Sequence, residues 1–103
     1  MELSVIAFLG LLVAVAALRI AELQISPSQQ VPWHCHTSVQ DTFFVIRGSL
    51  RIFLRNPKEE VRLAAGETHT VQARRPHLVT NGGADSAVFL VLQLGDYDFV
   101  PLA

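Results

Sequence analysis

The sequence predicts an all-β protein, an antiparallel sandwich or barrel, from three observations. About eight short runs are rich in β-branched and aromatic residues or alternate between apolar and polar ones. Turn signals separate these runs at close spacing, as is typical of sandwiches and barrels. Helix signals are almost absent beyond residue 18. We therefore expect a single small β domain over residues 19–103.

Four of the expected strands lie in the first half of this domain, at residues 18–25, 31–33, 42–47 and 50–55. In the first, Leu18, Ile20, Leu23 and Ile25 stand among polar residues, which indicates a half-buried strand. Residues 26–28, Ser-Pro-Ser, break this strand before the second begins. Gly48 lies between the third and fourth runs and predicts a hairpin turn.

The other expected strands cover residues 60–63, 68–72, 78–80 and 86–94. Turn signals stand at residues 56–59, 74–76 and 81–83, where proline, glycine and asparagine gather. Trp33, Phe43 and Phe44 are expected to fill the interior. The aromatic and apolar tail at residues 96–101 is expected to pack back on the domain or on a partner subunit.

Residues 5–18 form an uncharged apolar run that ends at Arg19. This run is shorter than the stretch of about 20 apolar residues that a membrane-spanning helix needs. Its length suits a signal peptide, and residues 14–16, Ala-Val-Ala, resemble a cleavage site, although only Glu2 precedes it as a charged residue. Three interpretations of residues 1–18 stay open: a signal or anchor segment, an extra strand or helix, or a wrongly chosen start codon.

Composition excludes several classes of protein. Half of the residues are hydrophobic, 17% are charged and the net charge is −1, which does not fit a disordered chain. The balance of 8 basic and 9 acidic residues lacks the basic surface of a nucleic-acid-binding protein. Cys35 is the single cysteine, so the chain has no internal disulfide framework. We expect no nucleic-acid partner and a cytoplasmic location, or export or membrane anchoring if residues 5–18 act as a leader.

The histidines carry the predicted chemistry. His34 and His36 are two residues apart on an extended segment, so their side chains point to the same side. Asp41 opens the next strand and can bring a carboxylate to the same place, and His77 can add a third nitrogen from a neighbouring strand. Three imidazoles and one carboxylate suit a divalent transition metal, Fe, Mn, Ni or Zn, with open positions for water or substrate.

These residues resemble the two sequence motifs of the cupin superfamily. His34, His36, Asp41 and Gly48 stand at the spacing of the first motif, which has two histidines, a glutamate and a glycine. Gly66, residues 72–74, His77 and Asn81 are similar to the second motif, which has a glycine, a proline-any-glycine turn, a histidine and an asparagine. The resemblance covers residues 18–95 and identifies the chain as a small single-domain cupin.

The resemblance implies a double-stranded β-helix, or jelly-roll barrel, in which His34, His36, Asp41 and His77 hold the metal. Two departures from the family pattern affect the site. Asp41 is one methylene shorter than glutamate, so it coordinates the metal directly or through a bridging water. Gln72 and Arg74 replace the proline and glycine of the turn, so Arg74 is expected in a left-handed conformation at a cost of about 1 kcal/mol.

Two further residues are candidate substrate contacts. His69 shares a strand side with Val71 and can face the interior, and Arg75 lies near His77, where it can bind an anion. Two functions follow from the resemblance. The first is a metal-dependent enzyme, dioxygenase- or isomerase-like, that acts on a small organic acid or carbonyl compound. The second is a non-catalytic small-molecule-binding or sensory barrel. We expect a homodimer in either case.

Overall fold

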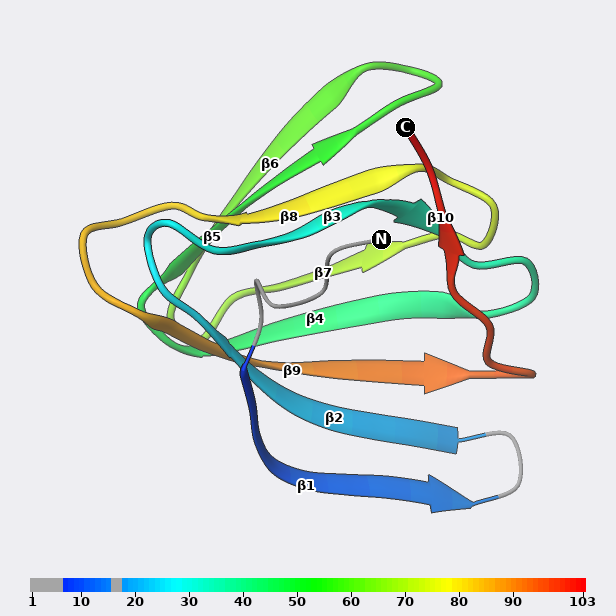
Figure 1. Cartoon of the computed structure of the whole chain (residues 1–103), viewed down its shortest axis with the longest axis horizontal. Coiled ribbons are helices and arrows are strands. Elements are labelled where there is room, and N and C mark those ends of the chain that lie inside the picture. Colours follow the sequence, from blue (N-terminus) through cyan, green and yellow to red (C-terminus); the bar gives the residue numbers. More distant parts are fainter. Residues whose placement is uncertain (1–6, 16–17) are drawn as a thin grey trace.

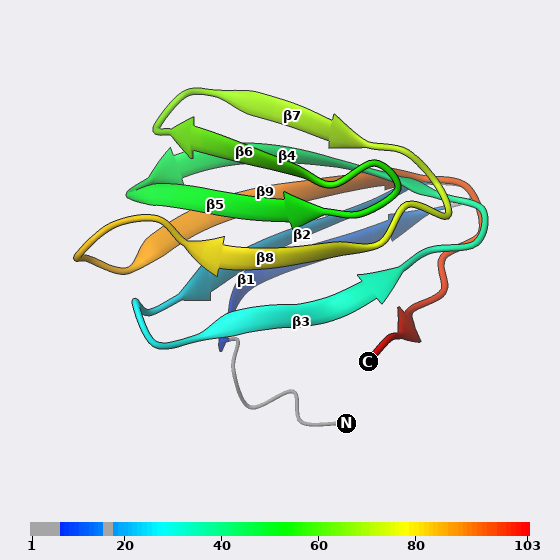
Figure 2. The ribbon, with the colours of Figure 1, turned by 90° about the horizontal axis from the view of Figure 1, so that it is seen from above.

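The computed structural model describes residues 7–15 and 18–103, with side chains from residue 18 onward. These residues form two five-stranded antiparallel sheets that face each other (Figures 1 and 2). One sheet has the order β1-β2-β9-β4-β7 and the other has the order β10-β3-β8-β5-β6. The strands are β1 Ala7–Val15, β2 Leu18–Ile25, β3 Gln30–Cys35, β4 Gln40–Arg47, β5 Ser49–Leu54, β6 Glu59–Ala64, β7 Thr68–Val71, β8 His77–Asn81, β9 Ala87–Leu94 and β10 Val100–Pro101.

The all-β prediction is confirmed. Each of the eight expected strands corresponds to one of β2 to β9, with bounds that differ by at most two residues. The described residues contain no helix, and therefore none that could cross a membrane. The tail prediction is also confirmed, because β10 pairs with the end of β3, where Val100 stands opposite Cys35.

The apolar run near the N-terminus contains a strand in its described part. Strand β1 pairs antiparallel with β2, from Ala7 opposite Gln24 to Val15 opposite Leu18. Residues 1–6 and 16–17 lie outside the described residues, and Ala16 of the predicted cleavage site is among them. The strand is one of the alternatives predicted for residues 1–18, and the signal or anchor interpretation stays a prediction.

The chain alternates between the two sheets, and this alternation positions the site. Strand β3 belongs to one sheet, β4 to the other, and β8 again to the first. The connection between β3 and β4, residues 36–39, therefore crosses from one sheet to the other at one end of the molecule (Figure 1). Residues near this end of β3, β4 and β8 can meet between the sheets, although they are far apart in sequence.

The core lies between the sheets and follows the period of two of a β-strand. On β5, Leu50, Ile52 and Leu54 are buried and the residues between them are more exposed. Opposite them, Phe43 and Phe89 lie with their ring centroids 6.1 Å apart. Full burial of each such side chain contributes about 1.5–3 kcal/mol to the free energy of unfolding.

The prediction that Trp33, Phe43 and Phe44 all fill the interior is wrong in part. Phe43 is buried, but Phe44 is 38% exposed. Adjacent residues on a strand point to opposite faces, so both phenylalanines cannot enter one core. Trp33 is partly buried, and the Arg55 guanidinium lies 3.8 Å from the centre of its ring.

The outer face of the β4–β9 pair carries exposed apolar side chains, Phe44, Ile46 and Leu94. Exposed apolar groups on adjacent strands are a feature of surfaces that proteins cover by association. The homodimer stays a prediction.

The motif glycines occupy turns that favour glycine for different reasons. Gly48 has a φ of 80° and Gly66 a φ of 87°, both in the left-handed region. A Cβ at Gly48 would lie 2.8 Å from the backbone oxygen of Ser86, whereas a Cβ at Gly66 would meet nothing within 4 Å. Arg74 has a φ of 67°, which confirms the left-handed conformation expected where the motif has glycine.

Gly48 and Gly66 allow a matched test of how much the close contact of Gly48 with the backbone of Ser86 matters for stability. Gly66→Ala changes only the conformational preference and is expected to lower the free energy of unfolding by about 1–2 kcal/mol. Gly48→Ala also forces Cβ against backbone atoms, so it is expected to cost about 2 kcal/mol more. Urea denaturation of both variants measures the difference. Equal losses would show that the backbone around Ser86 moves freely to make room.

Candidate metal centre

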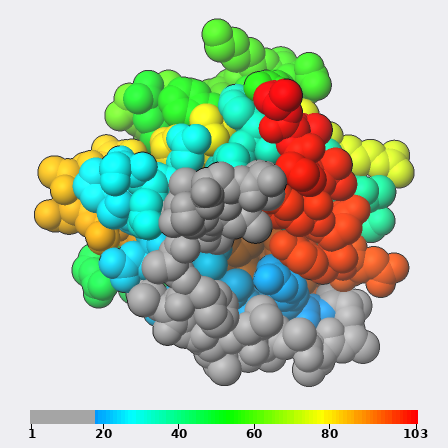
Figure 3. All heavy atoms as spheres, in the orientation of Figure 1, coloured from blue at the N-terminus to red at the C-terminus, as the bar shows by residue number. Residues whose placement is uncertain are grey.

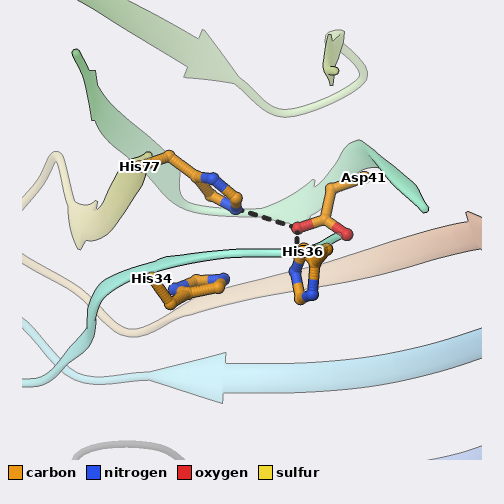
Figure 4. Close-up of side chains that lie close together, drawn as sticks. All are labelled: His34, His36, Asp41 and His77. Atoms are coloured by element: carbon orange, nitrogen blue, oxygen red, sulfur yellow. Dashed lines mark hydrogen bonds and ion pairs between the residues drawn. The ribbon is translucent and has the colours of Figure 1, made fainter. Parts of the chain in front are cut away.

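Four buried side chains converge between the two sheets (Figure 4). His34 lies on β3, His36 directly follows β3, Asp41 lies on β4 and His77 begins β8. Their relative exposures are 3%, 3%, 2% and 1%. One nitrogen or oxygen atom from each of the four lies within 4.8 Å of the others. Both sheets therefore contribute to one cluster, and the structure brings together all four residues predicted as metal ligands.

Backbone carbonyls orient all three imidazoles. Each histidine places Nδ1 beside a carbonyl oxygen: His34 with Pro32 at 2.7 Å, His77 with Arg75 at 2.8 Å, and His36 with Asp98. A carbonyl oxygen only accepts, so Nδ1 must carry the hydrogen in each case. In neutral imidazole the remaining nitrogen, Nε2, then has a free lone pair, which is the form that binds metals.

Asp41 completes the cluster. Its Oδ2 lies 2.9 Å from Nε2 of His77 and 3.0 Å from Nε2 of His36. Its Oδ1 accepts a hydrogen bond of 2.6 Å from the side-chain amide of Gln93. If the histidines are neutral, lone pairs of nitrogen and oxygen face one another at these distances. Such an arrangement requires a positive charge between them, which protons or a metal ion can supply.

The surroundings shift the pKa values of three cluster members. Burial, together with the nearby His77, lowers the pKa of His34 to about 4. Burial opposes the charged form of His36 too, but the hydrogen bond to Asp41, the negative charge of Asp41 and the Asp98 carbonyl together raise its pKa. Burial likewise opposes ionisation of Asp41, but the hydrogen bonds from His36, His77 and Gln93 and the charge of His36 together lower the pKa of its carboxyl group. At neutral pH His34 is therefore neutral and Asp41 is ionised.

These residues could bind a divalent metal. Three imidazole nitrogens and one carboxylate oxygen are a common donor set for Fe, Mn, Ni or Zn. The three carbonyls behind Nδ1 and the Gln93 amide behind Asp41 are the outer hydrogen bonds that such ligands ordinarily have. Nothing in the donor set selects one of these metals over the others.

A cavity of about 190 Å³ adjoins the cluster. His34, His36 and Asp41 line it at one side, and most of its wall consists of apolar side chains such as Val31, Val79 and Phe89. The polar lining outside the cluster comes from Arg19, Gln93 and Tyr97. A small ligand in this cavity would lie beside the cluster in apolar surroundings.

The C-terminal segment covers one side of the cluster. Phe99 stacks on the ring of His34 with 4.4 Å between centroids, and Tyr97 lies 5.6 Å from the ring of His36. The Asp98 carboxylate also accepts a 2.8 Å hydrogen bond from the backbone N–H of Thr37. Figure 3 shows these last residues, in orange and red, as a continuous band on the surface. The segment thus contributes both a carbonyl and an aromatic wall to the site.

Sequence reasoning missed three contributors: Arg19, Gln93 and the Asp98 carbonyl. Gln93 is 3% exposed and stands in the otherwise apolar strand β9, so a polar residue in a buried run was its only signal. The Asp98 carbonyl carries no signal, because any residue provides one.

The two predicted substrate contacts lie elsewhere. His69 stands opposite Phe43 on β7 and is partly buried, but it does not line the cavity. Arg75 also does not line it. The Arg75 guanidinium instead donates hydrogen bonds to Glu59 and to the backbone oxygens of Arg55 and Pro57.

Comparison with known proteins shows which family and fold the chain is similar to. A family model described as "Cupin domain" matches residues 21–93. Among curated proteins, none matches the chain significantly. An uncharacterised conserved protein with a double-stranded β-helix domain from Klebsiella pneumoniae has a TM-score of 0.77 at 23% identity, over 87% of this chain and 75% of its own. These findings confirm the predicted double-stranded β-helix.

Several enzymes share the fold over part of their length. Oxalate decarboxylase from Bacillus subtilis, whose Mn(II) centres have been characterised, has a TM-score of 0.78 at 22% identity, over 84% of this chain and 24% of its own. A structure from work on DMSP lyases has a TM-score of 0.71 at 27% identity, over 84% of this chain and 44% of its own. The chain spans 27% of Lactobacillus farciminis oxalate decarboxylase and 46% of an oxalate oxidase.

The lowered pKa of His34 predicts an acid-sensitive stability in metal-free protein. Between pH 6.5 and about 4 the unfolded chain takes up a proton that folded His34 refuses, so the free energy of unfolding falls as the pH falls. The loss from this residue is about 3 kcal/mol at most. Urea denaturation at several pH values, with chelator present, measures it.

His34→Gln serves as the control, because glutamine does not titrate. The wild type is expected to lose more stability than this variant over the same pH window. His36 has the opposite effect, because its raised pKa stabilises the fold at low pH. Both proteins contain His36, so its effect cancels in the comparison. Parallel pH profiles would contradict the prediction.

Proposed function

The chain belongs to the cupin domain family, and we propose that it is a metal-dependent enzyme acting on a small organic acid or carbonyl compound. The observation that carries the proposal is the converging set of three Nε2 atoms and the Asp41 carboxylate, each held from behind by a hydrogen bond. His34, His36, Asp41 and His77 would hold one divalent metal, Fe, Mn, Ni or Zn. A bound metal of this kind supplies Lewis-acid or redox chemistry.

The cavity supports a small substrate. Its volume of about 190 Å³ is below the roughly 300–1,000 Å³ of ordinary ligand pockets. The apolar wall would exclude water from a bound molecule and strengthen its polar contacts. A reaction of the dioxygenase or isomerase type is consistent with a site that offers a substrate few polar partners.

The second candidate is a non-catalytic barrel that binds a small molecule. One observation favours it: the titratable groups that line the cavity outside the four-residue cluster are Arg19 and Tyr97. Burial raises the pKa of Tyr97 above its usual value, so its hydroxyl stays protonated at neutral pH. The described cavity thus lacks a carboxylate or imidazole base outside the cluster, which favours binding over proton abstraction by the protein.

Metal content tests the site. Protein purified without chelator, or reloaded after chelation, is expected to contain one metal ion per chain by elemental analysis. The double variant His34→Ala/His77→Ala is expected to lose affinity by roughly 100-fold or more, since it removes two ligands. His69→Ala is the matched control, because His69 is a histidine outside the cavity. A wild-type metal content no higher than that of the double variant would sink the proposal.

Turnover separates the two candidate functions. Metal-loaded protein is offered a panel of small organic acids, diketones, thiols and phenols, with oxygen consumption and product formation measured. The enzyme proposal predicts turnover that disappears in the His34→Ala/His77→Ala variant and survives in His69→Ala. Saturable binding with no turnover across the panel would favour the non-catalytic barrel instead.

A further inference from the structure

We propose that Arg19 recognises a carboxylate group, so that the ligand of this cavity is a small acid held at one end by the Arg19 guanidinium and at the other by the metal cluster. The inference rests on the proposed metal site and adds the chemical class of the ligand and the residue that selects it.

The register of one sheet places Arg19 in line with the cluster. Arg19 on β2 stands opposite Gln93 on β9, and Gln93 stands opposite Asp41 on β4. Residues paired in this way point to the same face of a sheet. All three line the cavity, so the guanidinium and the cluster face one space with a single amide between them.

Among the described residues, the groups that hold the guanidinium leave most of its donors available. Nη1 donates a 2.7 Å hydrogen bond to the Gln93 oxygen, and the guanidinium carbon lies 4.0 Å from the centre of the Tyr97 ring. Stacking on an aromatic face and one hydrogen bond restrict the planar group without neutralising it. Arginine has five N–H donors, which match a carboxylate in a two-point contact.

Within the described part of the chain, three other arginines form ion pairs with glutamates, and Arg19 does not. Arg51 and Arg62 both pair with Glu60, and Arg75 pairs with Glu59. Among the ion pairs of residues 18–103, none includes Arg19. Arg75, which the sequence suggested as an anion contact, is therefore already paired with Glu59. Arg19, in contrast, lines the cavity.

Electrostatics in the cavity favour an anion. With a divalent ion bound, the cluster would carry one net positive charge, because its histidines are neutral and Asp41 contributes one negative charge. Arg19 adds a second positive charge next to apolar walls, where charges are screened less than in water. At ~30 Å³ per water-sized group, the cavity holds roughly six non-hydrogen atoms. A short acid with a second oxygen fits both the charge and the size.

A purely structural role for Arg19 makes different predictions. In that role the guanidinium would only hold the Gln93 amide, and through it Asp41. Loss of Arg19 would then weaken metal binding and leave carboxylate binding to metal-loaded protein unaffected. The two roles are distinguished by measuring metal and carboxylate binding separately.

The probes are glycolate and its neutral amide, glycolamide, which differ in charge but have similar size. Each is titrated into Mn(II)-loaded protein, with binding followed by calorimetry and by the Mn(II) EPR spectrum. Wild-type protein is expected to bind glycolate at least 10-fold more tightly than glycolamide. Arg19→Gln is expected to weaken glycolate binding by about 10- to 100-fold, since it removes a charged two-point contact. Its metal content is expected to stay that of the wild type.

Two further variants sharpen the test. Arg19→Lys keeps the charge but not the planar fork, and is expected to fall between the wild type and Arg19→Gln. Arg47→Gln removes an exposed arginine from β4 and is expected to bind glycolate like the wild type. Wild-type glycolate affinity in Arg19→Gln, or a loss confined to its metal content, would overturn the inference.

Metal content is measured first, so that failure of the metal site is recognised by itself. If wild-type protein holds no metal, the arginine contact is followed in metal-free protein through the NMR signal of Arg19 Nε–H during the same titrations. A shift with glycolate and none with glycolamide supports the carboxylate contact. Equal responses, or no response, would overturn it.

Discussion

The hydrogen bonds from Nδ1 of His34, His36 and His77 to backbone carbonyls are the constraint on which the site depends. They force the three rings to present Nε2 to the same point, where the Asp41 carboxylate also arrives. The carbonyls belong to three separate segments, those of Pro32, Arg75 and Asp98. The three rings therefore have their metal-binding orientation only when all three segments are folded. The pairing of the strands brings these segments together.

The fold and the four cluster residues could be predicted because their signals are local. Alternating residues mark β5, and the spacing of His34, His36 and Asp41 spans one turn between strands. Arg74 was predictable as a left-handed residue from the motif position alone. The prediction for Phe44 was wrong because adjacent strand residues point to opposite faces. Since Phe43 points into the core, Phe44 points out of it.

The remaining parts of the site depend on pairings between distant residues. The contact of Arg19 with Gln93 joins positions 74 residues apart, and that of Gln93 with Asp41 joins positions 52 apart. Together they require the register of three strands, and a shift of one residue would turn these side chains to the other face. Spacing in a sequence carries no information on such a register. Spacing could therefore single out Arg75, which is near His77 in the chain, but it could not single out Arg19.

The carbonyl of Asp98 belongs to a segment beyond residues 21–93, the part that matches the family model. The ribosome makes His34, His36, Asp41 and His77 before it makes that carbonyl, and a domain generally folds as a unit. A chain that ends before Asp98 lacks the acceptor for Nδ1 of His36, and only the contact with Asp41 would then orient that ring. The segment around Asp98 must therefore be present before all three rings have a carbonyl that fixes Nε2 as the free nitrogen.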